Sequence, residues 1–297
     1  MKRLRPFILH QPSSVREAVE LLGAGAGEAR VLAGGTDLLV DMKLVRVRPA
    51  AVINLKRIDG LDRIDQVEGG IHIGSLARVS SLESSPLVRE KCGALWQASR
   101  VLASRPVRNL ATIGGNLGRA SPASDLAPPL IVHGAILQVE GLEGKRPVPV
   151  EQFHVGPGVS CLAPHEIITG VFLPDPPART GSAYRKLGKR GGGSDIALVG
   201  VAVSVLLGDG GRVADVRIAL ASVAPTPLRA RAAEDGLRGR MPSEESLAAA
   251  AEAAAEETRP ISDVRASSSY RKSLARVLTL RTLHDALSLA QQEPSLR

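Results

Sequence analysis

The sequence is poor in aromatic residues and in cysteine. Phe, Trp and Tyr make up 2% of the 297 residues, and there are two cysteines. Cys92 and Cys161 stand far apart and belong to no CxxC or Cys/His cluster, which excludes a zinc site or an iron–sulfur cluster encoded by this chain. The six histidines show no HExxH or comparable ligand spacing. Any metal chemistry linked to this protein must therefore come from another chain.

Long apolar runs are also missing. The longest, residues 196–207, falls short of the roughly 20 residues that a membrane span needs. The basic start, residues 1–6, is not followed by a long apolar region, so we expect no signal peptide and a cytoplasmic protein. Hydrophobic residues nevertheless make up 44% of the sequence, which excludes a disordered chain and predicts a core of Val, Leu, Ile and Ala.

The chain is basic, with a net charge of +8 and a pI near 10. Its Lys and Arg residues are spread along the sequence with Asp and Glu among them, and few aromatic side chains are available to stack on bases. Nucleic-acid binding is therefore the weaker interpretation. The basic excess suits the phosphates of a cofactor or acidic neighbouring subunits equally well.

Short helices and strands alternate in the first part of the chain. Ser14 and Glu17 form a capping-box pattern, which predicts a helix that ends at Gly23. The pattern over residues 80–103 predicts two helices, the second beginning at Pro86. Residues 112–129, rich in Gly, Ser and Pro, are expected to form a loop. A further helix is predicted at 38–43, and strands at 30–33, 51–55, 71–73, 135–139 and 166–173.

The pattern changes after the proline-rich segment 174–177, which we interpret as a linker. Residues 197–207 and 213–221 predict an antiparallel hairpin around a glycine-rich turn. Two helices are predicted after it, at 243–257 and 267–289. The sequence thus predicts an α+β fold of two domains, residues 1–175 and residues 176–297, the second an antiparallel sheet packed with helices.

Two glycine pairs are candidates for anion binding. Gly23, Gly25 and Gly27 do not continue as GxGxxG, and no P-loop occurs, which argues against a Rossmann domain or a P-loop ATPase. Residues 33–37 join a predicted strand to a predicted helix, where backbone N–H groups can converge on an anion. Residues 112–116 repeat a hydroxyl, two glycines and an amide. Two such facing loops could hold a pyrophosphate from both sides.

These segments resemble a known family. AGGTDLL (33–39), ATIGGNL (111–117) and ASPASDLAP (120–128) are similar to the flavoprotein subunits of the xanthine dehydrogenase and carbon monoxide dehydrogenase family. So are YRKLGKR (184–190), running into DIA, and YRK (270–272). The resemblance spans nearly the whole chain. It implies a two-part N-terminal FAD-binding domain of the PCMH, or vanillyl-alcohol-oxidase, type, followed by the C-terminal sheet and helices.

The resemblance also implies which residues surround FAD. Two loops would clasp its pyrophosphate: Leu32, Ala33, Gly34, Gly35 and Thr36, with Asp37 a neighbour, and Thr112, Ile113, Gly114, Gly115 and Asn116. The rest of the flavin site would include Ser121, Asp125, Ile168 and Lys186, the last two near the ring. Tyr184 is a candidate ring neighbour, and a core aromatic is an equal alternative. None of these residues is implied to be catalytic.

The sequence departs from the family at 189–194, where Gly191, Gly192 and Gly193 replace bulkier residues. We expect this segment to be mobile and to move between covering the flavin and admitting the electron acceptor. Lys189 and Arg190 beside it are candidates for docking onto an acidic partner, although they are as readily interpreted as solvated surface charges.

The function implied by the resemblance is electron relay. The chain would take electrons from the [2Fe-2S] clusters of an iron–sulfur small subunit and pass them to an external acceptor. A molybdopterin large subunit would oxidise the substrate, in a dimer of heterotrimers. A stand-alone FAD oxidase of the vanillyl-alcohol-oxidase type is the alternative, but it would need an aromatic-lined substrate pocket. A nucleotide-sensing module is a second alternative, which a flavin-coloured protein would exclude.

Overall fold

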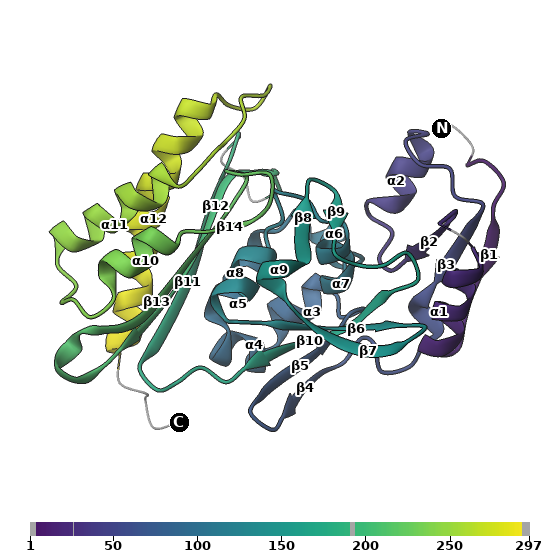
Figure 1. The fold of residues 1–297 in the computed structure, drawn as a ribbon, viewed down its shortest axis with the longest axis horizontal. Coiled ribbons are helices and arrows are strands. Elements are labelled where there is room, and N and C mark those ends of the chain that lie inside the picture. Colours follow the sequence, from purple (N-terminus) through teal and green to yellow (C-terminus); the bar gives the residue numbers. More distant parts are fainter. Residues whose placement is uncertain (1–3, 26, 191–193, 293–297) are drawn as a thin grey trace.

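The computed structural model describes residues 4–25, 27–190 and 194–292. Three sheets lie along the long axis of the molecule, as Figure 1 shows: a small one near the N-terminus, a second in the middle and a third covered by the C-terminal helices. The mixed α+β class predicted from the sequence is confirmed. Among the described residues, no helix has both the length and the apolar character that crossing a membrane requires.

The first sheet is parallel, in the order β1-β3-β2, and contains β1 (Ile8–His10), β2 (Ala29–Leu32) and β3 (Ala51–Asn54). Its helices are α1 (Val15–Ala24), α2 (Leu38–Lys43) and the short 3₁₀ helix η1 (Leu55–Arg57). The Ser14 hydroxyl accepts from the Glu17 N–H, as predicted, but the Glu17 carboxylate accepts from Ser13. The predicted stop at Gly23 is wrong, because α1 continues through it to Ala24.

The second sheet is antiparallel, in the order β4-β5-β10-β6-β7. Its strands are β4 (Ile64–Val67), β5 (Gly70–Gly74), β6 (Ile136–Gly141), β7 (Gly144–Pro149) and β10 (Ile167–Pro174). The edge strands β4 and β7 were not predicted. Each exposes most of its side chains, so neither has an alternating apolar pattern. A two-stranded ribbon, β8 (His154–Gly156) and β9 (Val159–Ser160), lies beside α9 (Val150–Phe153).

Six helices come from the middle of the chain: α3 (Val79–Ser84), α4 (Pro86–Lys91), α5 (Gly93–Val101), α6 (Arg105–Arg108), α7 (Ile113–Gly118) and α8 (Ala127–Val132). Of these, α5 and α8 pack against the third sheet. The prediction of two helices over 80–103 is wrong, because non-helical Ser85 and Cys92 divide it into three. The predicted loop over 112–129 is also wrong. Thr112 caps α7 by accepting from the Gly115 N–H, and two prolines begin α8, where their missing N–H groups cost nothing.

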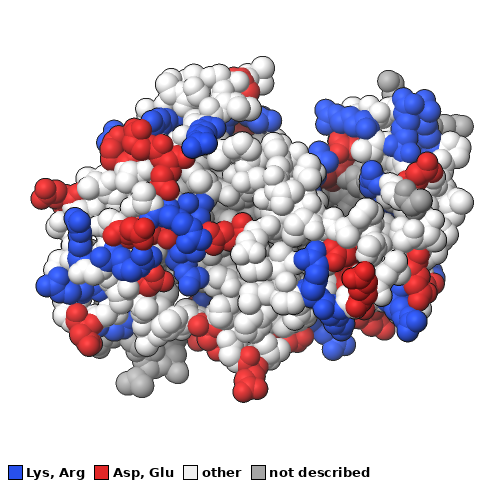
Figure 2. All heavy atoms as spheres, in the orientation of Figure 1, with Lys and Arg blue, Asp and Glu red and all other residues white. Residues whose placement is uncertain are grey.

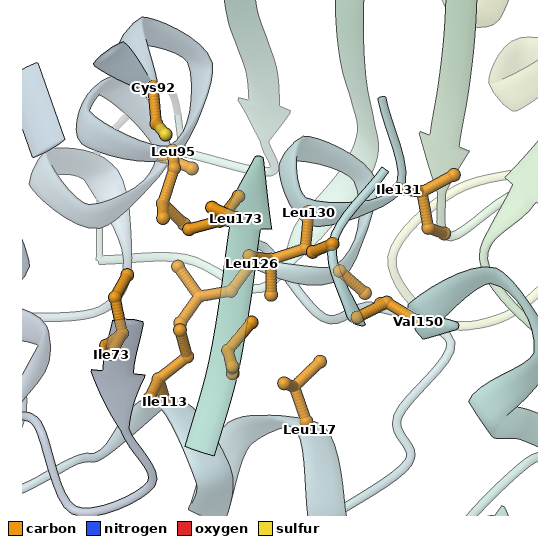
Figure 3. Close-up of a cluster of buried hydrophobic side chains, with 14 of the residues drawn as sticks. Ile73, Cys92, Leu95, Ile113, Leu117, Leu126, Leu130, Ile131, Val150 and Leu173 are labelled. Atoms are coloured by element: carbon orange, nitrogen blue, oxygen red, sulfur yellow. The ribbon is translucent and has the colours of Figure 1, made fainter. Parts of the chain in front are cut away.

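The central core is aliphatic, as the composition predicts. Ile113 and Leu117 of α7, Leu126 and Leu130 beside or on α8, and Leu173 of β10 are fully buried and converge in Figure 3. Burying one leucine side chain stabilises a fold by roughly 1.5–3 kcal/mol. The Gly- and Ser-rich segment that links α7 to α8 is therefore held on both sides by core residues.

The third sheet is antiparallel, in the order β11-β12-β13-β14. It contains β11 (Thr180–Gly188), β12 (Ala197–Leu207), β13 (Val213–Ala221) and β14 (Leu228–Arg229), with η2 (Asp209–Gly211) at the predicted hairpin turn. The helices are α10 (Arg231–Leu237), α11 (Glu244–Glu256) and α12 (Ser268–Gln291). The predicted hairpin and the two long helices are confirmed. Strand β12 is buried along most of its length because α12 covers one face and α5 and α8 approach the other (Figure 1).

Candidate functional site

A cavity of about 830 Å³ lies where the three parts of the molecule meet, and we call it the central cavity. The lobe of the first sheet contributes lining residues from 30–41, the central helices from 102–125, and the segment that precedes β12 contributes residues 194–196. Figure 2 shows the surface recessed between the lobe of the first sheet and the middle of the molecule. This volume is in the range of about 300–1,000 Å³ that is typical of small-molecule and cofactor sites.

Most of the predicted site residues line the central cavity: Ala33, Gly34, Gly35, Thr36, Asp37, Thr112, Gly114, Gly115, Asn116, Ser121, Asp125 and Ile168. Leu32 and Ile113 lie instead in hydrophobic clusters. Tyr184 and Lys186 are not among the described residues that line the cavity; both contact it through Asp125. The structure thus brings the two glycine segments and the predicted site residues Asp37 and Asp125 together around the central cavity.

The turn between β2 and α2 has free hydrogen-bond donors. Among the residues that the structure describes, no protein acceptor bonds to the backbone N–H groups of Gly34, Gly35, Thr36 or Asp37. Gly35 has φ +79°, a backbone conformation that is unfavourable for residues other than glycine. Because consecutive free N–H groups attract negative charge, this turn can hold an anion.

The second glycine segment has a different role. The Ile113 N–H donates to Ala77 O at 3.0 Å and the Gly114 N–H to Ser75 O at 2.9 Å. The Gly115 N–H donates to the Thr112 hydroxyl at 3.1 Å, and the Asn116 N–H to Thr112 O at 2.9 Å. The N–H groups of residues 113–116 are thus bonded within the protein, so this segment does not offer the same donors as the turn between β2 and α2. That residues 112–116 contact the pyrophosphate stays a prediction, since four of them line the central cavity.

The glycines serve close backbone packing. A Cβ on Gly34 would lie 2.0 Å from the carbonyl oxygen of Leu110, and one on Gly114 would lie 2.7 Å from Ser75. A side chain at Gly34 would therefore collide with the backbone of the neighbouring segment at Leu110. Gly34 lets residues 33–37 approach Leu110, and Gly114 lets the start of α7 approach Ser75, and both approaches form parts of the cavity wall.

Arg119 and Ser75 are among the lining residues that were missed from the sequence. Arg119, at the end of α7, donates to the buried Asp41 of α2 at 2.7 Å and lies 3.9 Å from Asp37, so it links α7 to the first sheet. Ser75, after β5, is 3% exposed, and its hydroxyl has no hydrogen-bond partner among the described residues. An unpartnered buried hydroxyl at a cavity wall is costly unless a ligand satisfies it.

A buried network surrounds Asp125. The Tyr184 hydroxyl donates to one carboxylate oxygen at 2.7 Å, and the Lys186 ammonium donates to the other at 2.8 Å and to Asp195 O at 3.1 Å. Burial raises the pKa of Asp125, and the charge of Lys186 opposes that rise. Burial also raises the pKa of Tyr184, so its hydroxyl stays protonated and able to donate. Tyr184 therefore has the position of a core aromatic that orients Asp125.

The C-terminal domain closes one side of the cavity with Ser194, Asp195, Ile196 and Arg265. Arg190 is ion-paired with Asp195 and lowers the pKa of that carboxyl. The Lys189 ammonium donates to Val264 O at 2.9 Å. Both cations are thus engaged within the chain at the edge of the site. The segment expected to be mobile, 191–193, lies outside the described residues.

Family models match both parts of the chain. The FAD binding domain in molybdopterin dehydrogenase matches residues 5–176, and the CO dehydrogenase flavoprotein C-terminal domain matches residues 182–286. The carbon monoxide dehydrogenase medium chain of Hydrogenophaga pseudoflava is 36% identical, over 94% of this chain and 96% of its own length. The xanthine dehydrogenase FAD-binding subunit of Escherichia coli O157:H7 is 31% identical, over 95% and 96%.

Solved structures agree with the fold. A chain of carbon monoxide dehydrogenase from Hydrogenophaga pseudoflava matches with a TM-score of 0.93 and 36% identity, covering 97% of this chain and 99% of that one. A chain of quinoline 2-oxidoreductase from Pseudomonas putida 86 matches with a TM-score of 0.91 and 28% identity, covering 98% and 100%. The similarity therefore extends over both domains and not over the glycine segments alone.

Proposed function

Since this chain belongs to the family of FAD-binding flavoprotein subunits of the molybdenum hydroxylases, we propose that it relays electrons. It takes them from the [2Fe-2S] clusters of an iron–sulfur small subunit and passes them to an external acceptor. A molybdopterin large subunit oxidises the organic substrate, and two such heterotrimers associate. The observation that carries this proposal is the central cavity, whose free N–H groups suit the pyrophosphate of FAD.

The residues present fit FAD. The free N–H groups of Gly34, Gly35, Thr36 and Asp37 would donate to the phosphate oxygens, and Arg119 adds a positive charge nearby. The Ser75 hydroxyl would gain the partner that it lacks. Asp125, Ile168 and Ile196 would surround the rest of the cofactor. When bound, FAD supplies one- and two-electron chemistry, while the protein positions the ring and excludes water.

Two further points are part of the proposal. The chain divides into the domains 1–175 and 176–297, which is supported by the change from the second sheet to the third between Pro174 and Thr180. The separate hydrophobic cluster of the third sheet and its outer helices supports the same boundary. The cytoplasm stays the predicted location.

The pyrophosphate assignment predicts a large difference in affinity between FAD and riboflavin, which lacks phosphate. Losing two charge-assisted hydrogen bonds of about 1.5–3 kcal/mol each should weaken binding at least 100-fold. Fluorescence titration of the flavin-free chain with each ligand measures the ratio, and inorganic pyrophosphate should compete with FAD. Equal affinities would show that the ring alone is recognised and would contradict the role of residues 34–37.

Electron relay predicts that the chain cannot oxidise organic substrates by itself. The isolated FAD-loaded chain should be inactive toward purines, aldehydes, carbon monoxide and aromatic acids. Affinity purification from its own cells, followed by native mass spectrometry and metal analysis, should recover two further subunits with iron and molybdenum. Rapid substrate oxidation by the chain free of both metals would favour a stand-alone oxidase of the vanillyl-alcohol-oxidase type instead.

A further inference from the structure

A second cavity, of about 610 Å³, opens on the lobe of the first sheet, and we call it the arginine cavity. Its lining residues come from three segments. Residues 5–6 precede β1, residues 27–30 lie at the start of β2, and residues 42–50 lead from the end of α2 to β3. Arg30, Arg46 and Val47 line both cavities, so the two adjoin. The other described lining residues of the arginine cavity do not line the central cavity.

The wall of the arginine cavity is strongly positive. Arg5, Arg30, Arg46 and Arg48 line it, and Glu28 is the one acidic residue among the described lining residues. Within the part of the chain that the structure describes, neither Arg5 nor Arg48 has a carboxylate within 4.0 Å; Arg46 is paired with Asp41 at 3.3 Å. Figure 2 shows Lys and Arg side chains gathered around α2, at the upper right. Like charges collected around a concavity repel one another and attract an anion.

The backbone that forms this wall is strained at Val45, which lines the cavity with φ +62°. A β-branched residue in this region is a genuine outlier, and glycine is the usual residue where a helix ends in this way. The Arg46 N–H donates to Asp41 O at 2.9 Å, so the chain turns sharply after α2. The turn directs residues 46–48 along the wall. Strained residues of this kind concentrate at ligand sites.

We propose that the arginine cavity binds a phosphate-bearing small molecule of nucleotide size, distinct from FAD. Guanidinium groups bind phosphate through paired, charge-assisted hydrogen bonds. The remaining wall, Pro6, Met42, Val45, Val47, Pro49 and Ala50, is aliphatic and provides a surface for an uncharged ring. The volume suits a ligand of this size. A nucleoside diphosphate therefore combines both features that the wall presents.

To test this proposal, ADP is titrated calorimetrically into the full chain that has first been saturated with FAD. ADP should bind with one site per chain, inorganic pyrophosphate more weakly, and adenosine not at all. Arg5→Ala and Arg48→Ala should each weaken the binding of ADP at least tenfold, which corresponds to the loss of one charge-assisted hydrogen bond. Both side chains are exposed and lack described ionic partners, so these variants should fold. Lysine at either position should restore part of the affinity, because it keeps the charge.

The matched control is Arg281→Ala, an exposed arginine on α12, at the far end of the molecule. It should leave both ADP and FAD binding unchanged. If saturating FAD abolishes ADP binding, the arginines belong to the FAD site and the proposal fails. If neither ADP nor pyrophosphate binds to the FAD-saturated chain at millimolar concentration, the proposal also fails, and an acidic protein surface becomes the better ligand. If the unsubstituted chain does not bind FAD, that result contradicts the proposed function and not the arginine cavity.

Discussion

Replacing Lys186 by methionine is expected to destabilise the protein by about 3–5 kcal/mol, the usual cost of leaving one buried charge without its partner. Lys186 and Asp125 have side chains only 4% and 9% exposed, so the carboxylate that remains is largely shielded from water. The variant keeps one of the two bonds to the Asp125 carboxylate, the one from Tyr184. Urea unfolding of the flavin-free chain measures the loss.

A second substitution separates charge from packing. Asp125→Asn combined with Lys186→Met removes both charges and should recover most of the lost stability. The matched control is Lys272→Met, because Lys272 lies 2.8 Å from Glu256, as close as Lys186 lies to Asp125, but on an exposed surface. Its cost should stay below about 1 kcal/mol. If Lys186→Met costs no more than Lys272→Met, the network around Asp125 does not stabilise the fold.

Gly34→Ala should weaken FAD binding at least 100-fold and destabilise the chain by about 1–3 kcal/mol, the range for forcing extra atoms into a packed site. A Cβ there would lie 2.0 Å from a backbone oxygen, so residues 33–37 must separate from Leu110. That separation displaces the free N–H groups that line the cavity. FAD titration and urea unfolding on the same preparations measure both effects.

Two further glycines provide controls for Gly34→Ala. Gly118→Ala also lines the central cavity, but its Cβ would lie 3.9 Å from Ile168, an ordinary contact, so folding and FAD binding should persist. Gly236→Ala, inside α10, meets no atom within 4 Å and should be neutral or stabilising by up to about 1 kcal/mol. A Gly34→Ala variant that binds FAD as tightly as Gly118→Ala would contradict the packing account.

The elements predicted from the sequence are those with a strong local pattern. The hairpin 197–221 has two long apolar runs around a glycine turn, and α12 begins at a serine cap, so neighbouring residues are enough to define them. Helices α7 and α8 were missed because Gly, Ser and Pro suggest a loop by composition. Their formation depends on the Thr112 cap, on the placement of two prolines in a first turn, and on burial of the flanking leucines.

In the candidate site too, some features could be predicted from a local sequence pattern and others could not. The free N–H groups of 34–37 follow a pattern that is visible in the sequence, a strand, two glycines and a helix. The bonds of Asp125 to Tyr184 and Lys186 join residues 59 and 61 positions apart, and no local pattern specifies them. Ser75 and Arg119 belong to the site only because β5 and α7 meet there. Such contacts come from the tertiary structure, and only the family resemblance pointed to some of them.

The position of α5 and α8 between two sheets has a consequence for synthesis of the chain. These helices come from the first half of the sequence, yet part of their apolar surface is covered by β11, β12 and β13, which the ribosome delivers later. Until then, that surface is exposed to solvent, and such exposed surfaces favour aggregation. The N-terminal half therefore completes its packing only after the third sheet has emerged from the ribosome.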